Sequence, residues 1–232
     1  KQEHEKLRGF GYSNTFYSSF RHGNKQGVSI LIHNSVKFDC SHDLSDKEGR
    51  YVIVKGTLEN VKVTLVNVYN PPNVNIQFLT NLLSKIITET EGILIWGGDF
   101  NMVLNTKLDS TNYKKQQTSS TKKFKLALEE FGFVDIWREL NPNIKDYTHY
   151  SAPNKSYSRI NYLFINKADL YKVKECKIEE TSISDHSSLI LKLNLPSRKH
   201  KTAWRLNVGL LNYKTIKAEI SHEIKTYIED ND

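Results

Sequence analysis

The sequence predicts an α/β fold in which two β-sheets pack face to face and helices cover their outer faces. Two observations lead to this prediction. Runs of alternating apolar and polar residues, separated by turn residues, are typical of β-hairpins and recur along the chain. Segments with apolar residues at three- and four-residue spacing, typical of amphipathic helices, stand between them. The length of 232 residues and the hydrophobic content of 38% suit one domain with a sizeable core.

The first part of the chain predicts three strands and a helix. Residues 27–33 form the first strand, and residues 51–69 form a hairpin that turns at Glu59 and Asn60. The prolines within residues 70–73 end the second hairpin strand, because proline has no backbone N–H to donate. The apolar face predicted for the following helix consists of Leu79, Leu83, Ile86 and Ile87.

The next elements are a short buried strand at residues 93–96 and a helix at residues 119–131 that stops at Gly132. The residues expected to face inward from this helix are Phe124, Ala127, Leu128 and Phe131. Three further elements are a hairpin that turns at residues 152–155, a short helix and a last strand, in residues 146–165, 168–174 and 188–195.

The composition changes after Pro196. Residues 197–201 are basic, and the apolar residues between Tyr213 and Tyr227 fall at helical spacing. We therefore expect a folded domain in residues 1–196 and, in residues 197–232, a basic linker with an amphipathic helix.

The charge and the cysteines constrain the partners and the compartment. A net charge of +7 favours a polyanionic partner, although a basic protein without such a partner fits the charge equally well. Cys40 and Cys176 are too few for a disulfide framework or a zinc cluster, which favours a reducing, intracellular location in the nucleus or cytoplasm. No apolar run approaches the roughly 20 residues of a membrane span, so no membrane partner is expected.

The first candidate site residues are Asp99 and Asn101, which follow a predicted buried strand and two glycines. Residues two apart in a strand point the same way, so both side chains are expected to converge on one object. A carboxylate beside an amide suits the orientation of a water molecule and the binding of a phosphate oxygen next to a divalent metal. The alternative is a turn that closes the strand, with Asp99 capping the next segment.

Three other strand ends also carry polar side chains. Tyr69 and Asn70 end the first hairpin, residues 157–162 begin another strand, and Asp185 and His186 precede the last strand. An adjacent Asp-His pair suits a carboxylate near a metal and an imidazole that acts as an acid or base. Four such ends favour one site shared between strands over four separate turns.

These motifs resemble the endonuclease/exonuclease/phosphatase family, and most closely the endonuclease domain of LINE-type non-LTR retrotransposons. The three family motifs are GGDFN, SRINY and SDHS, in this order. The resemblance covers most of residues 9–195, and residues 202–212 resemble the segment that links endonuclease to reverse transcriptase in such elements. The further matching stretches are QGVSILI, DKEGRYVIVKG, LVNVYNPP, NMVLNTKLD, YTHYSAPNKSY and SSLIL.

The resemblance implies a four-layered α/β sandwich of two mixed β-sheets flanked by helices, the DNase I-like fold. It also implies hydrolysis of phosphodiester bonds in DNA with a divalent metal, usually Mg²⁺, and makes the partners DNA and a reverse-transcriptase region of the same polyprotein. By motif, Asp99 orients or deprotonates the attacking water, Asn101 holds the phosphate, and His186 stabilises charge on the phosphate oxygens. Asp185 lies near the metal, and Tyr69 contacts the scissile phosphate.

The DNA contacts implied by the resemblance lie around the second hairpin. Thr148, Ser158 and Ile160 lie on or next to a hairpin that reaches into the DNA groove in the retrotransposon branch. His149 is expected to be a hairpin-surface residue and not a ligand.

The chain departs from the family pattern in two ways. The family begins with a strand–helix–strand unit of roughly 30 residues that carries the main metal-binding Glu, and this unit is missing here. One sheet should therefore lack an inner strand and expose an apolar edge. The family also has Asp where this chain has Asn161, which orients His186 but cannot compensate its charge. We therefore expect endonuclease activity to be weak or absent.

Two alternative functions remain open from the sequence. One is a non-catalytic, basic DNA-binding remnant, which would bind DNA in a salt-sensitive way without cleaving it. The other is the phosphatase branch of the family, acting on phosphorylated lipids, and the retrotransposon-like tail speaks against it.

Overall fold

The computed structural model describes residues 9–20, 27–72, 76–112, 118–180, 184–195 and 212–231. The chain divides into two compact units, residues 1–196 and residues 197–232. Unit 2 contributes the helix α5 (Lys214–Asn231), and the basic segment at residues 197–201 lies outside the described residues. None of the described helices has the length and apolar character that crossing a bilayer requires.

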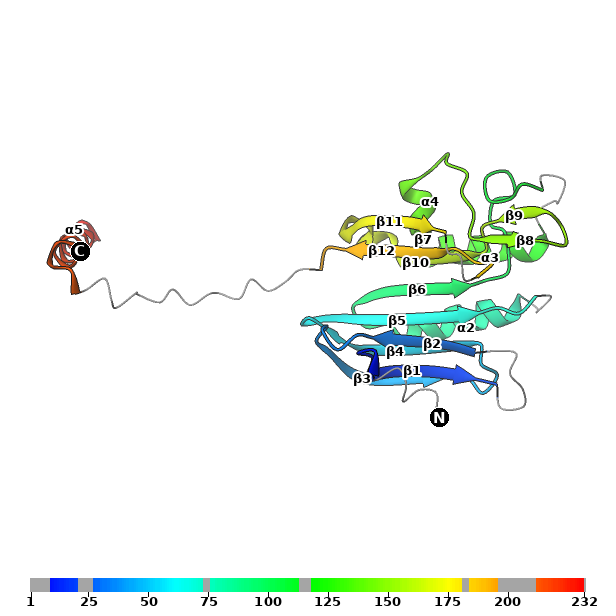
Figure 1. Ribbon diagram of the computed structural model, residues 1–232, viewed down its shortest axis with the longest axis horizontal. Coiled ribbons are helices and arrows are strands. Elements are labelled where there is room, and N and C mark those ends of the chain that lie inside the picture. Colours follow the sequence, from blue (N-terminus) through cyan, green and yellow to red (C-terminus); the bar gives the residue numbers. More distant parts are fainter. Residues whose placement is uncertain are drawn as a thin grey trace. The chain divides into compact units, whose positions relative to one another are not determined.

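A six-stranded mixed sheet forms the centre of unit 1 (Figure 1). All neighbouring strands are antiparallel except β5 and β6, which run parallel. In spatial order, the strands are β3 (Phe38–Ser45), β4 (Tyr51–Leu58), β5 (Val61–Tyr69), β6 (Ile93–Asp99), β10 (Asn161–Asn166) and β7 (Phe133–Asp135).

The predicted hairpin of residues 51–69 is confirmed as β4 and β5. Glu59 and Asn60 connect them, both with positive φ, at 48° and 70°. Two consecutive left-handed residues match the right-handed twist of the flanking strands, which is why such turns are preferred in two-residue hairpin loops.

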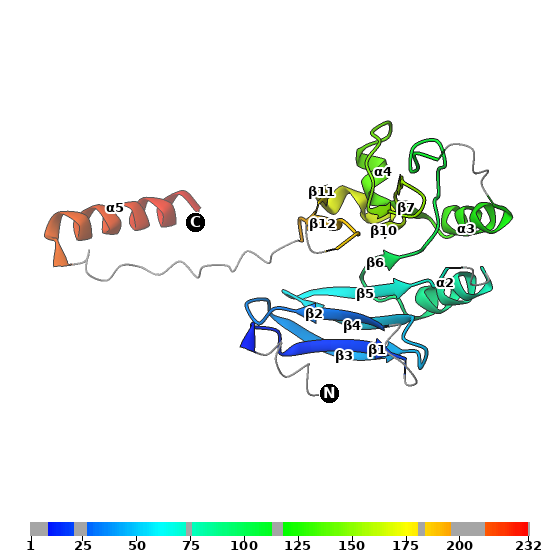
Figure 2. The ribbon, with the colours of Figure 1, turned by 45° about the vertical axis from the view of Figure 1, so that its right-hand side comes forward.

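Helices cover one face of the main sheet (Figure 2). They are α2 (Gln77–Glu89), which contains the four predicted apolar residues, and α3 (Ser119–Glu130), which is close to the predicted range of 119–131. Beneath them, Trp96 and Phe100 of the β6 segment contact Phe124 of α3, with the Trp96 and Phe124 ring centroids 5.8 Å apart. The buried face of α2 includes Leu82, whereas Ile87 is only partly buried.

The inward orientation predicted for Phe131 is wrong. The side chain is 41% exposed, because Phe131 is the C-cap of α3 and already leaves the helical path. Gly132 follows with φ of +70°, a left-handed conformation that ends helices and favours glycine.

The second sheet layer lies on the other face and consists of two separate antiparallel pairs. One pair, β1 (Asn14–Ser19) with β2 (Gly27–Ile32), packs against β4 and β5 through β2. The other pair, β11 (Val173–Glu179) with β12 (Ser188–Leu193), contacts β10 through β12. Among the described residues, β2 and β12 each have one edge without a strand partner.

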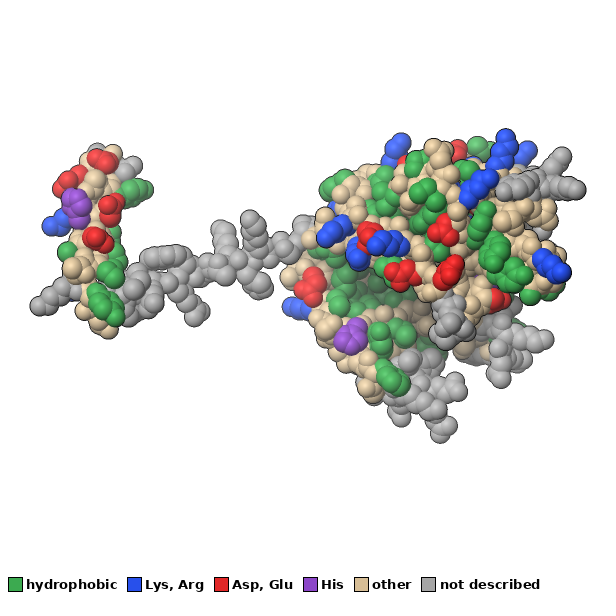
Figure 3. Space-filling model, turned by 45° about the horizontal axis from the view of Figure 1, so that its top comes forward, with side chains coloured by type: hydrophobic (Ala, Val, Ile, Leu, Met, Phe, Trp, Pro, Cys, Tyr) green, Lys and Arg blue, Asp and Glu red, His purple; other side chains and the backbone are tan. Residues whose placement is uncertain are grey.

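The floor of this gap is apolar. Leu65, Ile95 and Leu163 lie on three neighbouring strands and are only half-buried, whereas Val63 and Ile165, on the same face of the sheet, are buried. Figure 3 shows hydrophobic side chains in a recess of unit 1. The second layer therefore leaves the middle of the main sheet partly uncovered.

The remaining elements are short. The predicted second hairpin is confirmed, and the predicted helix at residues 168–174 is a 3₁₀ helix. These elements are α4 (Ile136–Leu140), β8 (His149–Ser151), β9 (Ser156–Ser158) and η1 (Lys167–Lys172). The predicted α/β class, with a mixed sheet and flanking helices, is confirmed.

Candidate active site

Three of the predicted site residues form one row across the main sheet. Asp99 at the end of β6 pairs with Tyr69 of the parallel strand β5 and with Asn161 of the antiparallel strand β10. Directly opposed residues project from the same face of a sheet. This face is the one that carries Ile95 and Leu163, so the row lies on the side of the second layer.

The glycine directly before Asp99 is required by the close approach of the neighbouring strand. Gly98 has φ of +140°, and a Cβ atom there would overlap the backbone of Val68 on the neighbouring strand. The glycines were expected to admit either a ligand or another backbone, and Gly98 admits the backbone of β5.

Asp99 and Asn101 meet through a turn and not through strand alternation. The strand ends at Asp99, and Asn101 has a left-handed φ of 48°. The Asn101 backbone N–H donates to Asp99 Oδ1 at 2.9 Å, and its side-chain Nδ2 donates to Asp99 Oδ2 at 3.1 Å and to the Asn70 carbonyl at 3.0 Å. The turn considered as an alternative therefore exists, and it is what brings the two side chains together.

The Asp99 carboxyl group is largely buried beside two imidazoles. Burial raises its pKa above the usual range, while the hydrogen bond from the Asn101 backbone and the charges of His186 and His149 act in the opposite direction. Asn161 links Asp99 to His186, because it pairs with Asp99 across the sheet and contacts the His186 ring. A carboxylate with a raised pKa is better suited to accept a proton near neutral pH.

His186 is oriented by Asn161. Its Nδ1 lies 2.9 Å from Asn161 Oδ1, and its backbone N–H donates to Ser184 Oγ at 3.0 Å. An amide oxygen only accepts hydrogen bonds, so Nδ1 carries the proton and Nε2 keeps a free lone pair. Asn161 thus selects one tautomer of His186 without adding a charge.

Thr148 connects the strand ends beneath the site. Its Oγ1 accepts hydrogen bonds from the backbone N–H groups of Ile160 and Asn161, at 3.0 and 3.1 Å, and its carbonyl accepts one from Ser187 N at 2.8 Å. The expectation that Thr148 and Ile160 contact DNA conflicts with their burial, at 0% and 7% exposure. Of the three residues expected there, Ser158 alone is partly exposed.

Sequence reasoning missed Arg159, which fixes the start of β10. Its buried guanidinium contacts Asp109 at 3.0 Å and Asp135 at 2.6 Å. Burial acts to lower the pKa of Arg159, but the charges of Asp135 and Asp109 outweigh burial and raise the pKa. The motifs that contain Arg159 and Asp109, SRINY and NMVLNTKLD, were visible, but 50 residues separate the partners.

His149 has contacts that the sequence did not predict. It belongs to β8, but its ring centroid lies 4.6 Å from that of His186, and its Nε2 lies 3.7 Å from Asp185 Oδ2. His149 is therefore a half-buried hairpin residue that lies against His186.

Comparison with known proteins agrees with this arrangement. A profile of the Endonuclease/Exonuclease/phosphatase family matches residues 2–186. The chain belongs to the endonuclease/exonuclease/phosphatase family. The resemblance inferred from the motifs is thereby confirmed.

Among curated relatives of this family member, the transposon TX1 uncharacterized 149 kDa protein of Xenopus laevis is 27% identical over 191 residues. The match covers 80% of this chain and 14% of the length of that protein.

Two solved structures show the same fold. An AP endonuclease from Archaeoglobus fulgidus superimposes with a TM-score of 0.64 at 18% identity, covering 82% of each chain. The endonuclease domain of TRAS1, a telomere-specific non-LTR retrotransposon, gives a TM-score of 0.61 at 18% identity, covering 79% of this chain and 80% of that one. The family member described here therefore has the DNase I-like fold predicted from its motifs.

Proposed function

We propose that unit 1 hydrolyses phosphodiester bonds in DNA at the ends of β5, β6 and β10, and that Asn161 keeps this activity weak. The observation that carries the proposal is the continuous arrangement from Asn101 through Asp99 to Asn161 and His186 on one face of the sheet. The relatives named as endonucleases and as a transposon protein support the reaction class.

Each residue has a role that its contacts support. Asp99, with its raised pKa, accepts a proton from the attacking water. Both N–H groups of Asn101 Nδ2 are used, by Asp99 Oδ2 and the Asn70 carbonyl, so Asn101 would exchange one of these hydrogen bonds for one to a phosphate oxygen. Tyr69 contacts the scissile phosphate from the neighbouring strand. The Nδ1–H of His186 donates a hydrogen bond to Asn161 Oδ1, which leaves Nε2 to interact with the reacting group.

The donor set fits a weakly held divalent metal. Mg²⁺ binds through one or two carboxylates and keeps several waters. The Asp185 side chain is 68% exposed, and the contacts of its carboxylate with described residues are long, 3.5 Å to Ser184 Oγ and 3.7 Å to His149 Nε2. Asp185 would hold the ion, and Mg²⁺ when bound would neutralise charge on the phosphate.

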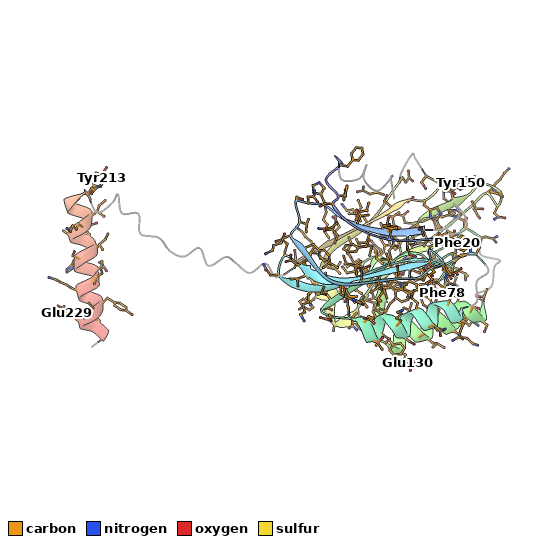
Figure 4. All side chains as sticks on the ribbon, turned by 90° about the horizontal axis from the view of Figure 1, so that it is seen from below. Phe20, Phe78, Glu130, Tyr150, Tyr213 and Glu229 are labelled. Atoms are coloured by element: carbon orange, nitrogen blue, oxygen red, sulfur yellow. The ribbon has the colours of Figure 1, made fainter. Side chains whose placement is uncertain are left out.

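The DNA surface is proposed to be the β8–β9 hairpin with its exposed tyrosines. Tyr150 and Tyr157 are 38% and 49% exposed, and their ring centroids lie 4.7 Å apart. Figure 4 shows Tyr150 at the same end of unit 1 as Phe20 and Phe78, the end toward which β5 and β6 point in Figure 1. Exposed aromatic rings on a protein with a net positive charge can stack on unpaired bases of nucleic acid.

The gap in the second layer supports a proposal about the complete protein. An inner strand of the strand–helix–strand unit would pair with the free edges of β2 and β12 and cover Leu65 and Ile95. Residues 197–232 would then lead from the endonuclease domain toward a reverse-transcriptase region.

Plasmid nicking tests this proposal. The full chain is incubated with supercoiled plasmid and Mg²⁺, beside its Asp99→Asn variant and a complete member of the family. We expect nicking by the parent chain to be far slower than that of the complete relative and to be lost in Asp99→Asn. Nicking at the rate of the complete relative would contradict the impairment, and nicking unchanged in Asp99→Asn would contradict the site.

The second candidate, a DNA-binding remnant without catalysis, is favoured by the neutral Asn161 alone. Binding that weakens with salt, without any nicking by the parent chain or by an Asn161→Asp variant, would support this candidate.

A further inference from the structure

The proposed hydrolysis makes no use of His149, which belongs to a compact set of metal-ligand types. Ligand atoms of His149, Asp185 and His186 all lie within 4.8 Å of one another. His149 comes from β8, and the other two residues come from the loop before β12. Among the residues that the structure describes, this is the one such group of His, Cys, Asp or Glu side chains.

The backbone holds these three residues together independently of any ion. His149 and His186 form an isolated antiparallel bridge, flanked by hydrogen bonds from Tyr150 N to the Asp185 carbonyl at 3.1 Å and from Ser187 N to the Thr148 carbonyl at 2.8 Å. This backbone pairing therefore holds the two imidazoles next to each other, with ring centroids 4.6 Å apart. Small side-chain rotations are all that a shared ligand requires.

His186 is already in the form that a metal needs. Its Nδ1–H donates to Asn161 Oδ1, so the lone pair of Nε2 is free. Metal-bound histidines characteristically donate their other ring N–H to a carbonyl or carboxylate oxygen, which fixes both tautomer and ring orientation. Asn161 provides this outer hydrogen bond.

The ligand types select the class of ion. Two imidazole nitrogens and one carboxylate oxygen suit Zn²⁺ and Co²⁺, whereas Mg²⁺ prefers oxygen ligands. The Asp99 carboxyl group interacts electrostatically with both histidines. The Asp185 side chain, 68% exposed, leaves an open side for water.

We propose that His149, Asp185 and His186 bind one Zn²⁺-class divalent ion in preference to Mg²⁺. The claim concerns binding and holds whether or not the chain cleaves DNA. An ion bound there occupies Nε2 of His186, so it would also inhibit the proposed hydrolysis.

Titration of the full chain with Co²⁺ and Zn²⁺ tests the proposal. Co²⁺ binding is followed by visible absorption and Zn²⁺ binding by calorimetry, each with Mg²⁺ in excess. The key variant is His149→Phe, which keeps an aromatic ring against His186 but removes the ligand. The matched control is His222→Phe, on the exposed face of α5. The circular dichroism spectrum and the unfolding midpoint without metal confirm that each variant is folded.

We expect one ion per chain to be lost in His149→Phe and retained in His222→Phe. Asn161→Ala, which removes the outer hydrogen bond, should weaken binding by about 10- to 100-fold. Equal Zn²⁺ and Co²⁺ binding by the parent and by folded His149→Phe would overturn the proposal, as would displacement of the ion by Mg²⁺ at similar concentration. Nicking is not measured, so failure here leaves the proposed function standing.

Discussion

Asn161 accepts a hydrogen bond from His186 at 2.9 Å, at the position where the family pattern has aspartate. The geometry of an orienting pair is thus present while its negative charge is missing. In serine proteases the comparable Asp→Asn change lowers turnover by about 10⁴-fold by favouring the wrong tautomer. Here the amide oxygen faces Nδ1, so we expect the tautomer to be kept and the missing charge to weaken the site.

Restoring this charge should raise activity. We expect Asn161→Asp to increase plasmid nicking by at least about tenfold, because a carboxylate stabilises the protonated imidazole during the reaction. Asn166→Asp adds the same charge at the other end of β10 and should leave nicking unchanged. An equal increase in both variants would mean that general charge, and not the contact with His186, is responsible.

The Asp99 carboxyl group should limit stability at neutral pH. Its pKa is raised by burial, so the folded state favours the protonated form, and the cost of ionisation grows as pH rises from the ordinary value of 3.8 through the raised pKa. Asp99→Asn should therefore have a higher free energy of unfolding than the parent at pH 7. The difference between the two chains should disappear near pH 3.8. Urea unfolding of both chains across this pH range measures the difference, and a difference independent of pH would refute the explanation.

The buried ion pairs of Arg159 should be essential for the fold. Arg159→Ala removes the buried cation from Asp135 and leaves Arg138 as the charge partner of Asp109, and we expect it to cost about 3–5 kcal/mol in the free energy of unfolding. The exposed pair of Lys62 and Glu91 is a control, for which Lys62→Ala should change the free energy of unfolding far less, because solvent screens this pair. Equal costs in denaturant unfolding would contradict the structural role of Arg159.

The tyrosine pair of the hairpin should contribute to DNA binding. We expect Tyr157→Ala to weaken binding of single-stranded DNA by about 1–3 kcal/mol, the range found for base stacking on aromatic side chains. Tyr171→Ala, at a residue of η1 that is 78% exposed, serves as the control. Fluorescence anisotropy at fixed salt gives both affinities, and equal affinities would exclude the hairpin as the DNA surface.

Local signals in the sequence predicted much of the fold. The hairpin at Glu59 and Asn60 depends on neighbouring residues, and α2 and α3 follow from apolar spacing. The row of Tyr69, Asp99 and Asn161 was also within reach, because strand ends with polar side chains tend to meet at one edge of a sheet.

Contacts between residues far apart in the sequence could not be predicted from local patterns. The bridge between His149 and His186 depends on how the second hairpin docks beside the loop before β12, which no local pattern encodes. The same holds for Arg159 and Asp109, which meet only after the segment that follows β6 has packed against the start of β10. The burial of Thr148 also results from this docking, which is why its expected DNA contact does not agree with the structure.

Asp99 and His186 are proposed to act in one site, and paired nicking assays test this most directly. Supercoiled plasmid and Mg²⁺ are given to the Asn161→Asp chain and to the same chain with Asp99→Asn added. We predict nicking by the first chain above the parent level and a return to background in the second. Equal nicking by both chains would contradict the account, because it would place the reaction away from Asp99.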